Sequence, residues 1–196
     1  MKSPTCKFLN LLLLTLAVAG LATFSTGLAS AQTDVYRVNY FTLDNEAAIF
    51  QTVRIDNPGT TYGNVCAMIY VYAADQQLAE CCGCMETPNG LRTIPFSSLL
   101  FNTLTGVFPP SGVFKIVSAA PNGSVCDPTN VRPTPALREW GTHTQSTTTS
   151  PFFVLTETTF TPVTLGATEL ANLQAQCSFI HILGSGHGLC TCGTGD

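Results

Sequence analysis

The residues best suited to chemistry in this sequence are its cysteines. Three of them fall within four positions in the stretch AECCGCM, at Cys81, Cys82 and Cys84, and the chain closes on a second pair, Cys190 and Cys192. Cysteine thiolates bind zinc, cuprous copper and iron–sulfur clusters, act in redox exchange, or pair as disulfides. Which of these holds decides whether the cysteines form a working site or a set of cross-links.

The N-terminus indicates the compartment in which these cysteines are found. Two lysines stand at the start of an apolar run over residues 8–28, and a small-x-small sequence, ASA, then ends at Ala31. This order is typical of a secretory signal peptide. We expect residues 1–31 to be removed by cleavage before Gln32, leaving 32–196 as one exported domain, extracellular or periplasmic. An uncleaved membrane anchor is the alternative, and the ASA sequence argues against it.

Cleavage removes Cys6 and leaves an even number of cysteines in an oxidising compartment, which favours disulfides. The remaining cysteines are Cys66, Cys81, Cys82, Cys84, Cys126, Cys177, Cys190 and Cys192. We expect the cluster at residues 81–84 to pair with the tail at residues 190–192, because a glycine-rich chain end would otherwise fray. Bridging such distant residues also restricts the unfolded chain, which stabilises the fold.

A metal site is the main alternative for the same residues. Cys81 and Cys84 have the spacing of a zinc knuckle, and Cys190, Cys192 and His187 offer further ligands. Against this alternative stand Cys82, which lies inside the pair, and the lack of a second C-x-x-C motif. A thioredoxin-like redox pair fits less well, since it needs a helix N-terminus and a βαβ unit. The preferred interpretation therefore includes no cofactor and no metal.

A secreted hydrolase is the second alternative. Its candidate histidines and carboxylates are His143, His181, His187, Glu139, Glu157 and Glu169. The carboxylates come from different segments, and nothing in the sequence brings two of them together as a glycosidase requires. If His181 has no catalytic role, it simply alternates with Phe179 and Leu183 along an expected strand.

Period-two alternation predicts several of the strands that must position these residues. Residues 35–40 put Tyr36, Val38 and Tyr40 on one face. Residues 49–56 put Val53 and Ile55 inward. These patterns are typical of strands with one buried face.

Other segments are assigned from composition and turn residues. Residues 65–72 are apolar on both faces and are expected to form an internal strand. Further strands are expected at 91–96, 113–118, 152–160 and 179–183. The cysteine cluster is expected to follow a strand and lead into a turn, and residues 142–150 are expected to form a polar loop. One helix is predicted near Gly166–Gln176, where good helix formers recur.

Composition excludes some classes of partner. The whole chain has a formal net charge of −4, and it becomes more negative when the two lysines of the leader are lost. No basic patch remains for a phosphate backbone, so no nucleic acid is expected as a partner. No later apolar run is long enough to span a membrane. Trp140, the only tryptophan, is expected in the core rather than at a ligand, and Asn122 begins a glycosylation sequon on an expected turn.

Together these patterns predict an all-β, immunoglobulin-like sandwich that is cross-linked by disulfides and carries one short helix. The preferred function is that of an exported, non-enzymatic protein with a structural, adhesive or ligand-recognition role and a protein or glycan surface as its partner. The metal or redox protein and the secreted hydrolase stay open as alternatives, and so does the oligomeric state.

Overall fold

The computed structural model describes residues 32–43, 51–99, 106–146 and 153–183, together with Cys190 and Cys192. All of these residues belong to one compact unit, Ala31–Asp196. The expected signal peptide, residues 1–31, lies outside the described residues, and so does His187.

Within the described residues, nine strands form two antiparallel sheets, which confirms the expected mostly β, sandwich-like fold. Sheet A has the order β4-β3-β6-β1-β9, and sheet B has the order β5-β2-β7-β8. The strands are β1 (Gln32–Thr42), β2 (Thr52–Asp56), β3 (Val65–Ala73), β4 (Leu78–Glu86), β5 (Leu91–Pro95), β6 (Ser111–Ala119), β7 (Arg138–Ser146), β8 (Phe153–Thr159) and β9 (Thr161–Leu165). An immunoglobulin-like strand topology stays a prediction.

The main core lies between the two sheets and follows from the alternation of side chains along each strand. Val53 and Ile55 of β2 are buried, as the period-two pattern predicts. Phe41, Phe96 and Phe114 meet in the same core, where the Phe114 ring centroid lies 4.8 Å from each of the other two. Strand β3 lies between β4 and β6 and is buried on both faces over most of its length, which confirms it as an internal strand.

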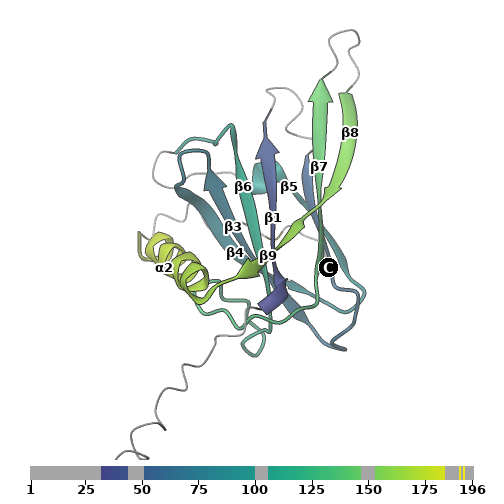
Figure 1. Ribbon diagram of the computed structural model, residues 1–196, viewed down its shortest axis with the longest axis vertical. Helices are drawn as coiled ribbons and strands as arrows, with labels where there is room; N and C mark the ends of the chain where they lie inside the picture. Colours follow the sequence, from purple (N-terminus) through teal and green to yellow (C-terminus); the bar gives the residue numbers. More distant parts are fainter. Residues whose placement is uncertain are drawn as a thin grey trace, which may run out of the picture. The chain divides into compact units, whose positions relative to one another are not determined.

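A second core lies on the other face of sheet A, under the helix α2 (Ala167–Leu183) (Figure 1). Leu173, Cys177 and Ile180 recur at spacings of four and three residues and form the buried face of the helix. Full burial of a leucine or isoleucine side chain stabilises the fold by about 1.5–3 kcal/mol. The helix therefore packs as a third layer over part of sheet A.

One residue, Phe160, joins β8 in sheet B to β9 in sheet A. Its side chain is buried in the core between the sheets, and its backbone N–H donates to the Glu139 carbonyl oxygen at 3.0 Å. The chain thus passes from one sheet to the other across a single buried residue.

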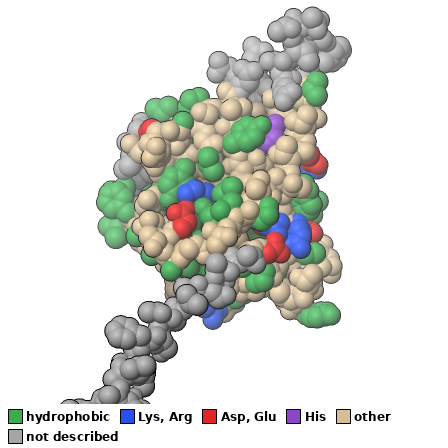
Figure 2. All heavy atoms as spheres, viewed as in Figure 1, with side chains coloured by type: hydrophobic (Ala, Val, Ile, Leu, Met, Phe, Trp, Pro, Cys, Tyr) green, Lys and Arg blue, Asp and Glu red, His purple; other side chains and the backbone are tan. Residues whose placement is uncertain are grey.

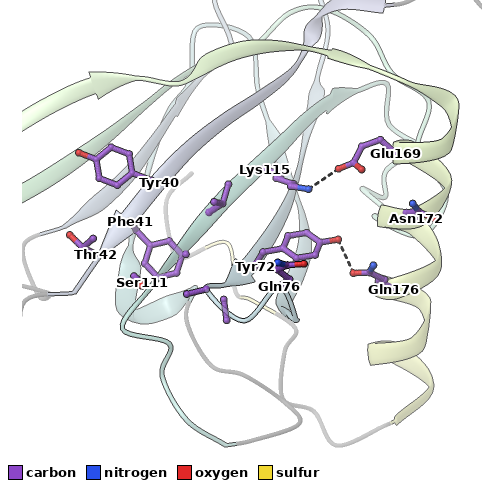
Figure 3. A pocket seen from close by; sticks show the side chains of 14 residues that line it. Tyr40, Phe41, Thr42, Tyr72, Gln76, Ser111, Lys115, Glu169, Asn172 and Gln176 are labelled. Carbon is purple, nitrogen blue, oxygen red and sulfur yellow. Dashed lines mark hydrogen bonds and ion pairs between the residues drawn. The ribbon is translucent and has the colours of Figure 1, made fainter.

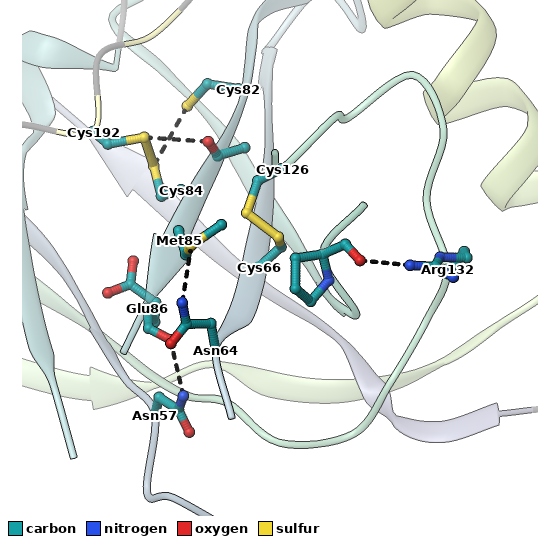
Figure 4. Close-up of a disulfide and its surroundings, with 12 residues drawn as sticks. Asn57, Asn64, Cys66, Cys82, Cys84, Met85, Glu86, Cys126, Arg132 and Cys192 are labelled. Atoms are coloured by element: carbon teal, nitrogen blue, oxygen red, sulfur yellow. Dashed lines mark hydrogen bonds between the residues drawn. A yellow bond between two sulfur atoms is a disulfide. The ribbon is translucent and has the colours of Figure 1, made fainter. Parts of the chain in front are cut away.

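The cysteine cluster lies inside strand β4, and the expectation of disulfides is confirmed (Figure 4). The bonds are Cys66–Cys126, Cys81–Cys177, Cys82–Cys190 and Cys84–Cys192. Cys82 and Cys84 bond the tail as predicted, whereas the prediction for Cys81 was wrong, because it bonds Cys177 of α2. Side chains along a strand point alternately to its two faces. Cys81 therefore lies in the core under α2, while Cys82 and Cys84 lie in the core between the sheets.

Gly83, in the middle of the cluster, allows the backbone around Cys126 to lie against β4. A Cβ atom at this position would come within 2.2 Å of the Cys126 carbonyl oxygen. No larger residue fits there without a backbone shift. The glycine of CCGC therefore serves the packing of the Cys66–Cys126 disulfide.

Buried charges help hold the tail on β4. The Arg92 Nε atom donates to the Glu86 carboxylate at 2.7 Å, and both side chains are almost fully buried. The same guanidinium donates to the backbone carbonyl oxygen of Cys192 at 2.7 Å and to that of Met85 at 2.8 Å. Arg92 of sheet B thus binds β4 and the tail together, beside the two disulfides.

Three predicted boundaries were wrong. The cysteine cluster lies within a strand rather than at the entry to a turn. Strand β7 includes Thr142–Ser146, which were expected to form a loop. The rest of that expected loop, residues 147–150, lies outside the described residues. The helix does not end near Gln176, and Phe179–Leu183 continue it instead of forming a strand. The Cys81–Cys177 bond and the burial of Ile180 fix the helix on sheet A where it enters this segment.

The expectation that Trp140 lies in the core was also wrong. Trp140 lies opposite Arg54 in the β2–β7 register, and Arg54 points away from the buried Val53 and Ile55. The indole is consequently only partly buried, and it belongs to neither core cluster.

In the part of the chain that the structure describes, no helix has the length and apolar character to cross a membrane. The four disulfides point to an oxidising compartment outside the cytoplasm.

Replacing Arg92 by Met is expected to lower the free energy of unfolding by about 3–5 kcal/mol, because it removes one partner of a buried ion pair. Urea unfolding without reductant measures this loss. The double variant Arg92→Met/Glu86→Leu is expected to recover much of it, since both charges are then gone. Arg132→Met, at an exposed arginine that also binds a backbone carbonyl oxygen, is the control and should change stability by about 0.5 kcal/mol or less. A loss in Arg92→Met no larger than in this control would contradict the role of the pair.

Candidate functional site

A groove of about 630 Å³ lies where α2 stops covering the outer face of sheet A (Figure 3). Strands β1, β3 and β6 form its floor with Tyr40, Tyr72 and Val113, and α2 forms one wall. Beyond the helix this face is open, since Tyr40 remains 56% exposed. The incomplete third layer therefore creates a concave surface on an otherwise packed domain.

The wall of the groove is a polar stripe along α2. Glu169, Asn172 and Gln176 follow one another at spacings of three and four residues, so they share one side of the helix. The buried stripe of Leu173, Cys177 and Ile180 is next to it and fixes the orientation of the helix. The sequence thus gives α2 one side for the core and another for the groove.

An ion pair lies inside the groove. The Lys115 Nζ atom lies 2.8 Å from the Glu169 carboxylate and 4.4 Å from the centre of the Tyr72 ring. The Tyr36 hydroxyl donates to the same carboxylate at 3.0 Å. Figure 2 shows a basic and an acidic patch side by side on this face, surrounded by hydrophobic side chains. The two charges cancel, and the groove is close to neutral.

The pKa values in the groove are shifted away from neutral pH. Burial tends to raise the pKa of Glu169, but hydrogen bonds from Lys115 and Tyr36 and the charge of Lys115 outweigh it and lower the pKa. Burial, together with the nearby Glu169 charge, raises the pKa of Tyr72 to about 12. Glu169 therefore stays ionised and Tyr72 stays protonated across physiological pH. Groups that hold one protonation state suit binding better than proton transfer.

Two tyrosine rings are held in place by neighbouring side chains. The Tyr72 hydroxyl donates to the Gln176 side-chain oxygen at 2.8 Å. The Tyr40 ring stacks on His143, with the ring centroids 4.8 Å apart. The groove therefore presents aromatic surfaces whose orientation is set before any ligand arrives.

The expected catalytic residues do not converge within the described part of the chain. His143 contacts Tyr40 and hydrogen-bonds the Thr158 hydroxyl at 2.9 Å, and burial lowers its pKa. His181 is exposed on α2, and His187 lies outside the described residues. Neither described histidine is hydrogen-bonded to a carboxylate there.

The three candidate carboxylates are also separate, and each contacts its own cation. Glu139 is buried between the sheets near Arg37 at 3.3 Å, Glu157 pairs with Arg54 at 2.6 Å on sheet B, and Glu169 pairs with Lys115 in the groove. Their separation gives no pair of the kind a glycosidase uses.

The residues of the expected metal site are engaged in disulfides where the structure describes them. Cys84, Cys190 and Cys192 lie on one side of β4, and Cys81 lies on the other. The Sγ atoms of Cys82, Cys84 and Cys192 lie within 4.8 Å of one another, a spacing that suits a metal only when the thiols are reduced. Asn122, the sequon residue, is exposed on a turn closed by backbone hydrogen bonds with Val125.

Sequence reasoning did not find the groove, although two signals for it were present. The alternation that put Tyr36, Val38 and Tyr40 on one face of a strand marked its floor. The spacing of Glu169, Asn172 and Gln176 along the predicted helix marked its wall. What the sequence lacked was the order of the strands, which brings Tyr72 and Lys115 beside them.

In comparisons with known proteins, no family model, no curated protein and no solved structure matches this chain.

Buried Glu139 predicts a pH dependence of stability. Burial, opposed by Arg37 and Arg138, raises the pKa of Glu139 from 4.5 to about 7. Between these values the folded state holds a proton that the unfolded chain has lost, so the contribution of Glu139 to stability is present below pH 4.5 and disappears as the pH rises to about 7. The expected loss over this window is on the order of 3 kcal/mol.

Urea unfolding of the parent protein and of Glu139→Gln between pH 4 and 8 tests this prediction. The variant should lack this decrease, so that its stability relative to the parent rises with pH. Glu157→Gln, at an exposed ion pair, is the control and should shift stability by about 1 kcal/mol or less. A stability difference between Glu139→Gln and the parent that stays constant with pH would refute the raised pKa.

Proposed function

We propose that this protein is an exported, non-enzymatic recognition protein and that the groove beside α2 binds a neutral, hydroxyl-rich ligand such as a segment of a glycan. The observation that carries the proposal is a pair of oriented tyrosine rings, Tyr40 and Tyr72, that line one groove together with the amides of Asn172 and Gln176. Pockets of this kind combine apolar surface with a few well-placed polar groups.

The chemistry of the groove matches a sugar better than a charged ligand. The face of a tyrosine ring packs against the apolar face of a pyranose, and side-chain amides both donate to and accept from hydroxyl groups. The charges of Lys115 and Glu169 are already paired with each other at 2.8 Å. An ionic ligand would have to break that pair, whereas a neutral one can hydrogen-bond to its edges.

The covalent framework supports a role outside the cell. Four disulfides stabilise the domain where cellular repair does not operate. The apolar leader expected over residues 1–31 provides an export route. We also propose that the strands follow the immunoglobulin-like topology expected from the sequence. The two packed antiparallel sheets support this part of the proposal.

Calorimetric titration of the full chain, produced in an exporting host, with a panel of neutral oligosaccharides tests the proposal. At least one sugar is expected to bind, and Tyr40→Ala or Asn172→Ala is expected to weaken that binding about tenfold or more, equivalent to about 1.4 kcal/mol. Tyr40 is 56% exposed, so this variant should remain folded. Tyr62→Ala, which removes a tyrosine that is 95% exposed outside the groove, is the matched control and should bind as the parent does.

Two results would contradict the proposal. One is the absence of binding to every sugar of the panel. The other is binding that Tyr62→Ala weakens as much as Tyr40→Ala does, because the ligand would then lie elsewhere.

A further inference from the structure

Among the residues that the structure describes, strand β8 forms an open edge of sheet B. It is the last strand in the order β5-β2-β7-β8, and Figure 1 shows it on the outside of the domain beside β7. Among the described residues, its ladder partners all belong to β7, over an uninterrupted register from Trp140↔Thr159 to Ser146↔Phe153. A strand paired on one side presents backbone N–H and C=O groups on the other, and these can pair with a further strand.

The other three sheet edges carry features that oppose such pairing. Strand β9 contains Pro162 and β5 ends at Pro95, and proline removes a backbone donor. On β4, the backbone carbonyl oxygen of Met85 already accepts from Arg92, and the disulfide-bonded Sγ atom of Cys192 lies 3.4 Å from the backbone carbonyl oxygen of Gly83. Strand β8, with the sequence FVLTETT, has no proline, no lysine and no register shift.

The side chains of β8 are suited to association. Val154 is 45% exposed and Leu155 is 58% exposed, and neighbouring strand residues lie on opposite faces. Glu157, the only charged residue of the strand, lies 2.6 Å from Arg54 of the same domain. An approaching strand therefore meets exposed apolar side chains on both faces and no unbalanced charge.

We propose that β8 pairs antiparallel with β8 of a second copy of this chain, about a two-fold axis near Thr156. This arrangement puts Glu157 opposite the Leu155 of the second copy, so the two Glu157 carboxylates are not direct neighbours across the ladder. Pairing of one edge with itself closes after two subunits, whereas pairing of β8 with a different edge would continue into a filament. Sheet B then runs through both subunits, and the groove beside α2, on sheet A, takes no part in the contact.

The test is the molar mass of the full chain, produced in an exporting host, measured by light scattering across a concentration series up to about 1 mM protein. The parent is expected to reach twice the monomer mass. Leu155→Glu is expected to stay monomeric, because it puts a second carboxylate opposite Glu157 of the other copy and removes the apolar contact. Val154→Lys provides a second variant on the other face of the strand, and circular dichroism checks that each variant is folded.

Val163→Lys is the matched control for Val154→Lys, since it puts the same charge in place of a valine that is 39% exposed on β9, the edge that contains Pro162. It is expected to dimerise as the parent does. A parent that is monomeric at every concentration overturns the proposal, and the edge would then be open only to a foreign strand. A dimer that persists in both folded β8 variants, or that Val163→Lys disrupts equally, also overturns it.

Discussion

Strand β4 is bonded covalently on both of its faces, and the three layers of the protein depend on it. Side chains in a strand alternate, so three nearly consecutive cysteines are divided between two cores. Cys81 reaches the helix, while Cys82 and Cys84 reach the end of the chain. A spacing that would suggest a zinc knuckle in a loop thus connects the helix, sheet A and the tail when it lies in an extended strand.

The groove depends on the same arrangement. The Cys81–Cys177 bond and the buried Leu173 and Ile180 set the rotation of α2, which directs its polar stripe toward Tyr72 and Lys115. A wall fixed in this way loses little conformational entropy when a ligand binds, and such preorganisation favours affinity. The stability of the outer layer and the proposed recognition surface therefore have one physical cause.

Local patterns in the sequence predicted what depends on local structure. The inward direction of Val53 and Ile55 and the internal position of β3 follow from side-chain periodicity, and both were predicted. Strand β4 was missed because Gly83 and Glu80 are weak strand formers and only tertiary contacts extend the chain there. The continuation of α2 through Phe179–Leu183 was missed for the converse reason, since the tertiary contacts of Cys177 and Ile180, rather than local propensity, extend the helix there. The groove combines strands that are distant in sequence, so its residues could not be grouped before the sheet order was known.

The four disulfides also overlap along the chain, and this determines how the protein responds to proteolysis. The spans 66–126, 81–177, 82–190 and 84–192 together cover every peptide bond between Cys66 and Cys192. A protease that cuts any one of these bonds leaves a single covalent molecule with both fragments attached. In an oxidising compartment, where these bonds persist, a single nick in this region would therefore release no fragment.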